Sequence, residues 1–339
     1  MNSKVIKFVA GAGKTTKSID IMKMNKNGLY IAFNNMIVDE VSHNGFLSKT
    51  IDSLFQNYII PKCIAFIPLI GAGKKIVYCD STTLPNYLNN VRNIKIHDDG
   101  TIYNKSALTS FSLFIPRKTF LGMNNVKNYS AVKYIFDDNQ VRLTDETRAG
   151  IAMFLLKNYN QIIIDILSKR FDYIIIDEAQ DLNYYREKFA KTLLASKITT
   201  IVLGDDYQNI NGGGDWFKNL TADEVCKNSY RCPENNCKWI RENLSIEIYG
   251  VSNESIIKQI TYDEVKKYDD GNTLLLYPSN SGENRNIINN WDGPMMTIKS
   301  SKGLTINNNI VIIGKKINKN NAYTAITRTT KDVYYTFKV

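Results

Sequence analysis

The stretch Phe8-Val-Ala-Gly-Ala-Gly-Lys-Thr-Thr16 decides the fold, because it joins an apolar strand, Val5 to Val9, to a helix through a glycine turn. Gly11 and Gly13 let the backbone bend so that successive N–H groups point at a polyphosphate. A helix that begins near Thr15 directs the positive end of its dipole at the same anion. We therefore expect a phosphate-binding loop composed of Ala10, Gly11, Ala12, Gly13, Lys14, Thr15 and Thr16.

Within this loop, Lys14 would reach the β- and γ-phosphates of a nucleotide and the Thr15 hydroxyl would bind Mg²⁺. The full pattern G-x-x-x-x-G-K-[ST] has a glycine where Phe8 stands. A glycine turn that happens to precede Lys-Thr is the alternative, and further motifs must decide between the two.

Composition bounds the class of protein. A chain of 339 residues with 43% hydrophobic and 22% charged residues is expected to be globular, with two or three domains. Lys4 and Lys7 interrupt the first apolar stretch, so we expect no secretory signal, and no run is long enough to span a bilayer. We expect a soluble protein with no membrane partner.

The cysteines indicate a reducing compartment. Their number is five, which is odd and argues against a disulfide framework, so cytoplasm or nucleus is expected. Cys226, Cys232 and Cys237 lie near each other in sequence, but without a C-x-x-C pair or a nearby histidine. Buried thiols are expected rather than a zinc site.

The net charge of +10 has two explanations. Clustered Lys and Arg gain affinity for a polyanion by releasing counterions from phosphates. A coding bias toward Lys, Asn and Ile would raise the charge without any such partner.

Strand-loop-helix units follow the loop in series. Gly28 precedes the apolar run Leu29–Phe33, and Lys49–Phe55 resembles a strand end passing into a helix. Such units predict a doubly wound parallel sheet. Residues 61–140 show no sustained period and are expected to be an insertion. Gly71-Ala-Gly-Lys-Lys75 within it echoes the first loop, but Lys75 offers no hydroxyl, so a basic turn is expected.

Two later strands end in polar side chains. Phe171–Asp181 contains four consecutive apolar residues followed by Asp177 and Glu178, and Asp177 could hold Mg²⁺ while Glu178 polarises the attacking water. An acidic helix cap is the alternative. The run Thr199–Gln208 places Gln208 where it could sense the γ-phosphate or that water.

Gly212, Gly213 and Gly214 follow as a flexible tip before Trp216 and Phe217. These two aromatic residues could stack on unpaired bases or could belong to the core of the next helix.

The ordered series of motifs resembles the superfamily 1 helicases. Its members are GAGKT, DEAQ, GDDYQ, Ser229-Tyr-Arg-Cys-Pro233, Thr297-Ile-Lys-Ser-Ser-Lys-Gly-Leu-Thr305 and Tyr323-Thr-Ala-Ile-Thr-Arg328. DEAQD, G-D-x-x-Q-x-I and K-G-L are similar to the UvrD/Rep-like group, whereas Tyr-Arg-Cys-Pro and the C-terminal run are also similar to helicases of positive-strand RNA viruses. The subgroup stays open.

The resemblance implies two RecA-like α/β domains that sandwich ATP. The first would comprise residues 1–60 and 141–225 and hold Lys14, Thr15, Asp177, Glu178 and Gln208. Residues 61–140 would form an accessory domain, and residues 226–339 the second RecA-like domain. The second would supply Arg231 and Arg328, because a loose phosphoryl-transfer transition state is stabilised by guanidinium groups. Gly303 would approach the nucleotide, and Thr305 stands where the family usually has an acidic residue.

The resemblance also implies a track for single-stranded nucleic acid. It would be built from Phe33, Asn34, Thr50, Ser53, Thr297 and Lys299. Short polar side chains and backbone amides grip phosphates there without reading sequence. The family generally has histidine where Lys299 stands. Few residues precede the first strand, so the glutamine that reads adenine in UvrD-like enzymes is not expected.

We therefore expect a Mg²⁺- and ATP-dependent helicase or translocase that acts on single-stranded DNA or RNA, with replication proteins as further candidate partners. A helicase-derived binding or transport protein with vestigial ATPase activity is the alternative. A kinase or transport ATPase would leave the Lys-Gly-Leu and Thr-Arg segments without a role. Compactness and the Lys, Asn and Ile bias suggest a viral or mobile-element origin.

Overall fold

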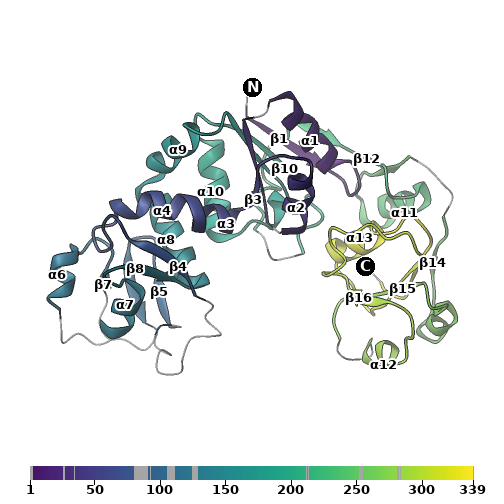
Figure 1. The fold of residues 1–339 in the computed structure, drawn as a ribbon. Coiled ribbons are helices and arrows are strands. Elements are labelled where there is room, and N and C mark those ends of the chain that lie inside the picture. Colours follow the sequence, from purple (N-terminus) through teal and green to yellow (C-terminus); the bar gives the residue numbers. More distant parts are fainter. Residues whose placement is uncertain are drawn as a thin grey trace.

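The structure is a computed structural model. It describes residues 3–25, 27–33, 35–79, 91, 93–104, 111–123, 129–210, 212, 214–251, 255–280, 282 and 284–338. Within these residues two large parallel sheets form two lobes, as Figure 1 shows, and a group of smaller elements lies on the far side of the first sheet from the second. The expected α/β class with doubly wound parallel sheets is confirmed.

The first sheet has six strands in the order β11-β1-β10-β9-β2-β3. They are β1 (Lys4–Phe8), β2 (Gly28–Ala32), β3 (Ser48–Thr50), β9 (Tyr173–Ile176), β10 (Thr199–Gly204) and β11 (Glu224–Cys226). The central strands read as continuous apolar runs because both faces of a parallel sheet are covered. Ile31 and Val202 pair with Ile176, so these strands end at one edge, and the polar residues that follow them gather there.

Helices cover both faces of this sheet. Alternate strand residues such as Tyr173 and Ile175 pack with α1 (Lys14–Met24) and α2 (Asn35–His43). Ile174 and Ile176 face the opposite way, toward a second group of helices. That group consists of α3 (Ile51–Leu54), the π-helix η1 (Phe55–Ile59), α4 (Ile60–Cys63), α8 (Asp145–Asn158), α9 (Asn160–Ser168) and α10 (Tyr184–Leu194).

The stretch expected to be an insertion contains small sheets and short helices. Strand β4 (Lys75–Tyr78) pairs in parallel with β8 (Gln140–Leu143), and β5 (Ile94–Ile96), β6 (Thr101–Asn104) and β7 (Phe111–Ser112) form an antiparallel sheet. The remaining elements are η2 (Ile64–Phe66), α6 (Arg117–Leu121) and α7 (Tyr129–Ile135). Gly71 and Gly73 have left-handed φ and lead into β4, so this segment is the expected basic turn and not a second loop-to-helix cradle.

The second sheet has five parallel strands in the order β14-β18-β17-β15-β16. They are β14 (Ile257–Gln259), β15 (Leu274–Tyr277), β16 (Met295–Thr297), β17 (Ile310–Ile312) and β18 (Val333–Tyr335). Around it lie α11 (Glu234–Leu244), η5 (Tyr262–Tyr268), α12 (Asn284–Asn289) and α13 (Lys319–Ile326). Strand β12 (Asn228–Ser229) pairs in parallel with β13 (Tyr249–Gly250), and these two strands form a separate small sheet. One apolar cluster joins Val9 and Ala10 of the first lobe to Tyr323 of the second.

All five cysteines are free thiols, and Cys63, Cys232 and Cys237 are buried. No helix among the described residues combines the length and the apolar character needed to cross a membrane.

Candidate active site

The loop after β1 has the backbone of an anion site. Gly11 and Gly13 have φ of 73° and 81°, which glycine adopts without strain. Helix α1 begins at Lys14, and no described side chain caps its start. The first-turn amides of a helix lack intrahelical acceptors, so these N–H groups are available to a phosphate. Ala10 and Ala12 are buried, Thr15 is half-buried and Thr16 is exposed.

Lys14 lies among the carboxylates that end β9. Its Nζ is 2.5 Å from Glu178 Oε1 and 3.8 Å from Asp177 Oδ1. Burial opposes the charge on Lys14, but Glu178 and Asp177 outweigh it and raise the pKa of the ammonium. Asp177 also accepts a hydrogen bond of 2.6 Å from the Tyr30 hydroxyl. The loop lysine and the strand-end carboxylates therefore lie together at this edge of the sheet.

Glu178 is held in an unusual backbone conformation. Its φ of 53° is left-handed, which costs a non-glycine residue free energy and is often found at functional sites. Gln180 donates to Glu178 Oε2 and accepts from the Asp205 amide at 3.1 Å, which ties the end of β9 to the end of β10. Burial alone would raise the pKa of Glu178, but Lys14 and Lys302 lower it to about 2.

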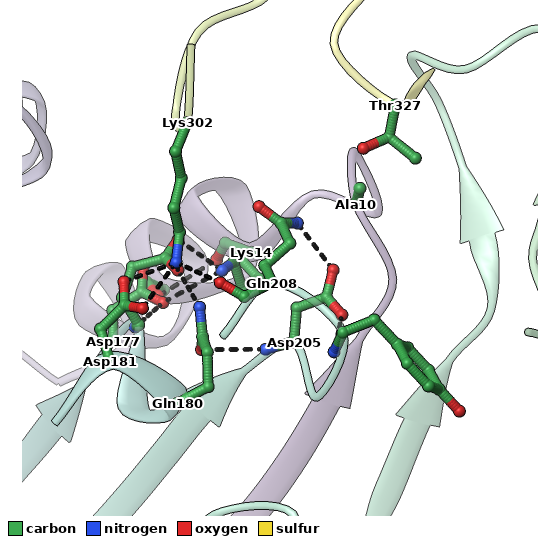
Figure 2. Close-up of polar contacts among 12 residues, drawn as sticks. Ala10, Lys14, Asp177, Gln180, Asp181, Asp205, Gln208, Lys302 and Thr327 are labelled. Atoms are coloured by element: carbon green, nitrogen blue, oxygen red, sulfur yellow. Dashed lines mark hydrogen bonds and ion pairs between the residues drawn. The ribbon is translucent and has the colours of Figure 1, made fainter. Parts of the chain in front are cut away.

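The second lobe contacts this edge of the first sheet through Asp205 and Gln208, which follow β10. Gln208 Nε2 donates to Asp205 Oδ2 at 2.6 Å. The Tyr323 hydroxyl of α13 donates to the same oxygen at 3.0 Å and accepts from the Ala10 amide at 2.8 Å. Figure 2 shows Gln208 and Asp205 joined by the first of these bonds, close to Lys14. A single phenol oxygen thus connects the second lobe to the phosphate loop and to the end of β10.

The two arginines implied by the resemblance lie at the same junction. Arg328 is 1% exposed, and its Nη2 donates to Gln208 Oε1 at 3.1 Å. Burial and the neighbouring Arg231 lower the pKa of Arg328 to about 9, which still leaves it charged at neutral pH. Arg231 Nη1 donates to the Leu304 carbonyl at 3.4 Å and to Thr305 Oγ1 at 3.3 Å.

The segment around Arg231 also contacts the phosphate loop. The Tyr230 amide donates to the Gly11 carbonyl at 2.9 Å. A Cβ on Gly11 would lie 2.8 Å from Arg231 Cβ and from Ser229 Oγ. Arg231 Nε is buried and has no hydrogen-bond partner among the described residues. An orphaned cationic N–H next to a glycine loop is suited to an anion.

Lys302 is the main residue of this candidate site that sequence reasoning missed. Its Nζ donates to Asp181 Oδ1 and Oδ2 at 2.7 and 2.6 Å and to the Gln208 carbonyl at 2.6 Å, and it lies 4.0 Å from Glu178 Oε2. Figure 2 shows Lys302 descending from the second lobe onto these groups. The available signal was its place in the Lys-Gly-Leu segment. Tyr30, Gln180, Asp181, Asp205 and Tyr323 were missed as well. Gly303 is exposed with φ of 87°, beside Leu304.

The described residues expected to form the nucleic-acid track lie near the ends of β2, β3 and β16. Phe33 follows β2, with the Arg186 guanidinium 5.5 Å from its ring centroid. Thr50 Oγ1 accepts from the Ser53 amide at 3.1 Å and caps α3. In the second lobe, Thr297 ends β16 and Lys299 is exposed. Asn34 lies outside the described residues.

Trp216 requires a correction. It is 6% exposed and packs edge-on against the fully buried Phe217, with ring centroids 6.1 Å apart. The indole has no free face on which a base could stack, so the core interpretation applies to both aromatic residues.

Comparison with known proteins supports the resemblance over part of the chain. Residues 116–212 match the family model of the UvrD/REP helicase N-terminal domain. This segment includes Asp177, Glu178 and Gln208 but not the phosphate loop, and over it the expected UvrD/Rep likeness is confirmed. No curated protein matches the chain.

Several solved structures are similar in fold over 98% of this chain. One is described as the PRRSV helicase, with 15% identity and a TM-score of 0.49, and the match covers 52% of that chain. The helicase nonstructural protein 10 of an arterivirus has 11% identity and a TM-score of 0.47, with 59% of that chain covered. Its complex with DNA has 11% identity and a TM-score of 0.45, with 60% covered. The present chain thus spans little more than half the length of these proteins.

Proposed function

We propose that this protein is an ATP-dependent helicase or translocase that couples Mg-ATP hydrolysis to movement on single-stranded DNA or RNA. The observation that supports this most is the junction of the lobes. Arg328, Lys302 and Tyr323 of the second lobe bond to Gln208, Asp181 and Asp205 at the carboxyl edge of the first sheet. A motor needs a hydrolysis site that both lobes complete, because hydrolysis is then coupled to their relative motion.

The residues present fit a nucleoside triphosphate. The glycine loop and the start of α1 would bind its phosphates, with Lys14 as the buried cation and the orphaned Nε of Arg231 as a further donor. Thr15 and Asp177 would hold Mg²⁺, which when bound neutralises phosphate charge. No cluster of three or more metal-ligating side chains occurs in the described chain. Mg²⁺ needs none, since it uses one or two protein ligands, substrate phosphates and water.

Glu178 is proposed as the general base. Its low pKa depends on Lys14 and Lys302, whose positive charges stabilise the carboxylate. When Lys14 turns toward a phosphate, Glu178 loses part of that stabilisation, and its pKa rises toward a value better suited to accepting a proton. Gln208 bonds to both Asp205 and Arg328, and through these bonds it would report the state of the site to the second lobe.

ATP turnover measured with and without single-stranded DNA and RNA tests the proposal. We expect single-stranded DNA, RNA or both to stimulate hydrolysis. We also expect the protein to unwind duplexes of the stimulating nucleic acid that carry a single-stranded overhang of one polarity. Turnover that no single strand changes would instead favour a binding or transport protein with vestigial ATPase activity.

A further inference from the structure

A cavity of about 140 Å³ opens beside the edge strand β3, on the flank of the first lobe. Its floor is apolar and includes Leu29, Leu54 and Phe171, and its rim includes Lys49, Ser53 and Arg170. Ser53 belongs to the expected nucleic-acid track, whereas Leu29 lies at the opposite, amino-terminal end of β2 and Phe171 precedes the start of β9. The cavity therefore meets that track at Ser53 and extends away from it toward the opposite end of the strands.

The rim is strongly basic. The Arg170 guanidinium lies 4.9 Å and the Lys62 ammonium 5.0 Å from the centroid of the Tyr58 ring, so two cations share one tyrosine. Lys49, Lys62 and Arg170 are exposed, and none forms an ion pair with another described residue. No carboxylate lines the cavity.

The nearest acidic residue on α3 is already neutralised. Asp52 accepts two bonds of 2.7 Å from Arg186 and one of 3.2 Å from Arg148. These arginines and the Tyr185 hydroxyl lower the pKa of Asp52, although burial opposes them. Lys49 and Arg170 on the rim, and Lys62 beside Tyr58, thus form no ion pair with a described carboxylate, and an external anion is the partner that their charge favours.

The backbone at the cavity is also irregular. Tyr58 and Asn57 belong to the π-helix η1, and π-helical turns occur frequently at functional sites. Drug-sized sites occupy roughly 300–1,000 Å³. A cavity of about 140 Å³ suits something smaller, such as one flat ring with an apolar face.

We propose that this cavity receives one unpaired base of a single-stranded nucleic acid, and that Lys49 and Arg170 hold the adjoining phosphates. The strand would leave the expected track at Ser53 and continue along α3 and η1 toward the inserted elements. This inference rests on the proposed function, since it lengthens the path of the same strand.

Charge reversal tests the phosphate contacts. The variant Lys49→Glu/Arg170→Glu is compared with Lys258→Glu/Lys267→Glu, which makes the same charge change at exposed positions of the second lobe. Affinity for a fluorescent oligothymidylate is measured across a salt series. Each phosphate contact contributes a slope of about 0.7 in log affinity against log salt for single strands, so two lost contacts should lower the slope by about 1.4 and the affinity by about tenfold or more.

Leu47→Trp tests the base contact without changing charge. Leu47 lines the cavity and is 40% exposed, so the larger ring can fill the cavity from its rim. We expect weaker binding of the oligothymidylate and unchanged binding of an abasic strand of equal length. In the wild-type protein the abasic strand should bind more weakly than the oligothymidylate.

The outcomes separate the two proposals. A wild-type protein that binds no single strand contradicts the proposed function itself. If the wild type binds but both rim variants behave like the second-lobe control, or if abasic and normal strands bind it equally, the cavity assignment is wrong while the motor function stands.

Discussion

At the scale of single residues, Glu178 has the clearest consequence for activity. Replacing it by Gln keeps the shape of the side chain and its place beside Gln180 and Lys14 but removes the proton acceptor. General bases contribute about 10²- to 10⁴-fold to a rate, so turnover by Glu178→Gln should fall by that factor while ATP binding remains. Phosphate release and binding of a fluorescent ATP analogue measure the two quantities. Turnover within tenfold of wild type would mean that the base is misassigned.

Glu178 also makes stability depend on pH. Its pKa falls from 4.5 to about 2 on folding, so its ionised form stabilises the folded protein. This contribution is fully present above pH 4.5 and is lost as pH falls toward 2. The Asp177 carboxyl has the opposite effect on the pH dependence of stability, because burial raises its pKa. Urea unfolding of wild type and Glu178→Gln should give a stability difference that is constant from neutral pH to about pH 5 and shrinks below pH 4.5. A difference that grows on acidification would contradict the assignment.

Lys302 neutralises a carboxylate that is almost fully buried, since the Asp181 side chain is 2% exposed. Removing one partner of a buried pair costs about 3–5 kcal/mol, because the other charge remains uncompensated. Lys302→Met should therefore lower the free energy of unfolding by an amount of this order, and adding Asp181→Asn should recover most of it. Urea titrations of the two single variants and the double variant measure the coupling. Strictly additive losses would show that the contact does not bind the lobes.

At the scale of elements, the sequence patterns were sufficient for the central strand-to-loop units of the first lobe. Continuous apolar runs identified β2, β9 and β10, and the residues that end them, Asp177 and Gln208, were found from local order alone. The strand order was not predictable in this way, because β1 pairs with β10 and β11 from distant parts of the chain. Sequence pattern could not decide between the two interpretations of Trp216 for the same reason. An aromatic residue after a glycine tip has no local signal that separates a core position from a stacking platform.

Gly11 in the phosphate loop and Gly45, which follows α2, offer a matched pair of substitutions by Ala. Gly11 and Gly45 have φ of 73° and 81°, so Ala at either position carries a similar backbone strain of about 1–2 kcal/mol. A Cβ at Gly11 would also lie 2.8 Å from Arg231 Cβ, whereas at Gly45 nothing lies within 4 Å. Gly11→Ala should therefore lose about 1–3 kcal/mol more stability than Gly45→Ala, and also lose ATP turnover. Equal unfolding midpoints for the two variants would mean that the loop does not pack on the Ser229–Arg231 segment.

At the scale of the whole molecule, the candidate site exists only because two sheets present their edges to each other. Local sequence pattern predicted the residues that the first lobe contributes to this site, from Lys14 in the phosphate loop to Gln208 after β10. The contacts of Lys302 and Tyr323 span 121 and 118 residues of sequence, and no local pattern encodes such pairings. Arg231 and Arg328 were found only through the resemblance, because an isolated arginine in a loop is usually a solvated charge. The cross-lobe half is thus a property of tertiary packing.

Tyr323 tests whether this packing transmits the state of the nucleic acid to the hydrolysis site. Its hydroxyl donates to Asp205 and accepts from the Ala10 amide, so Tyr323→Phe leaves the buried Ala10 amide without this partner, at about 1–3 kcal/mol, while Asp205 keeps its bond from Gln208. Tyr207→Phe is the control, because its ring packs against Tyr323 with centroids 5.6 Å apart while no described residue bonds its hydroxyl. If the phenol couples the lobes, Tyr323→Phe should retain basal ATP turnover but lose most of the stimulation by single strands, and Tyr207→Phe should keep both. Equal stimulation of the two variants would mean that the coupling runs through other contacts between the lobes, such as those of Lys302 and Arg328.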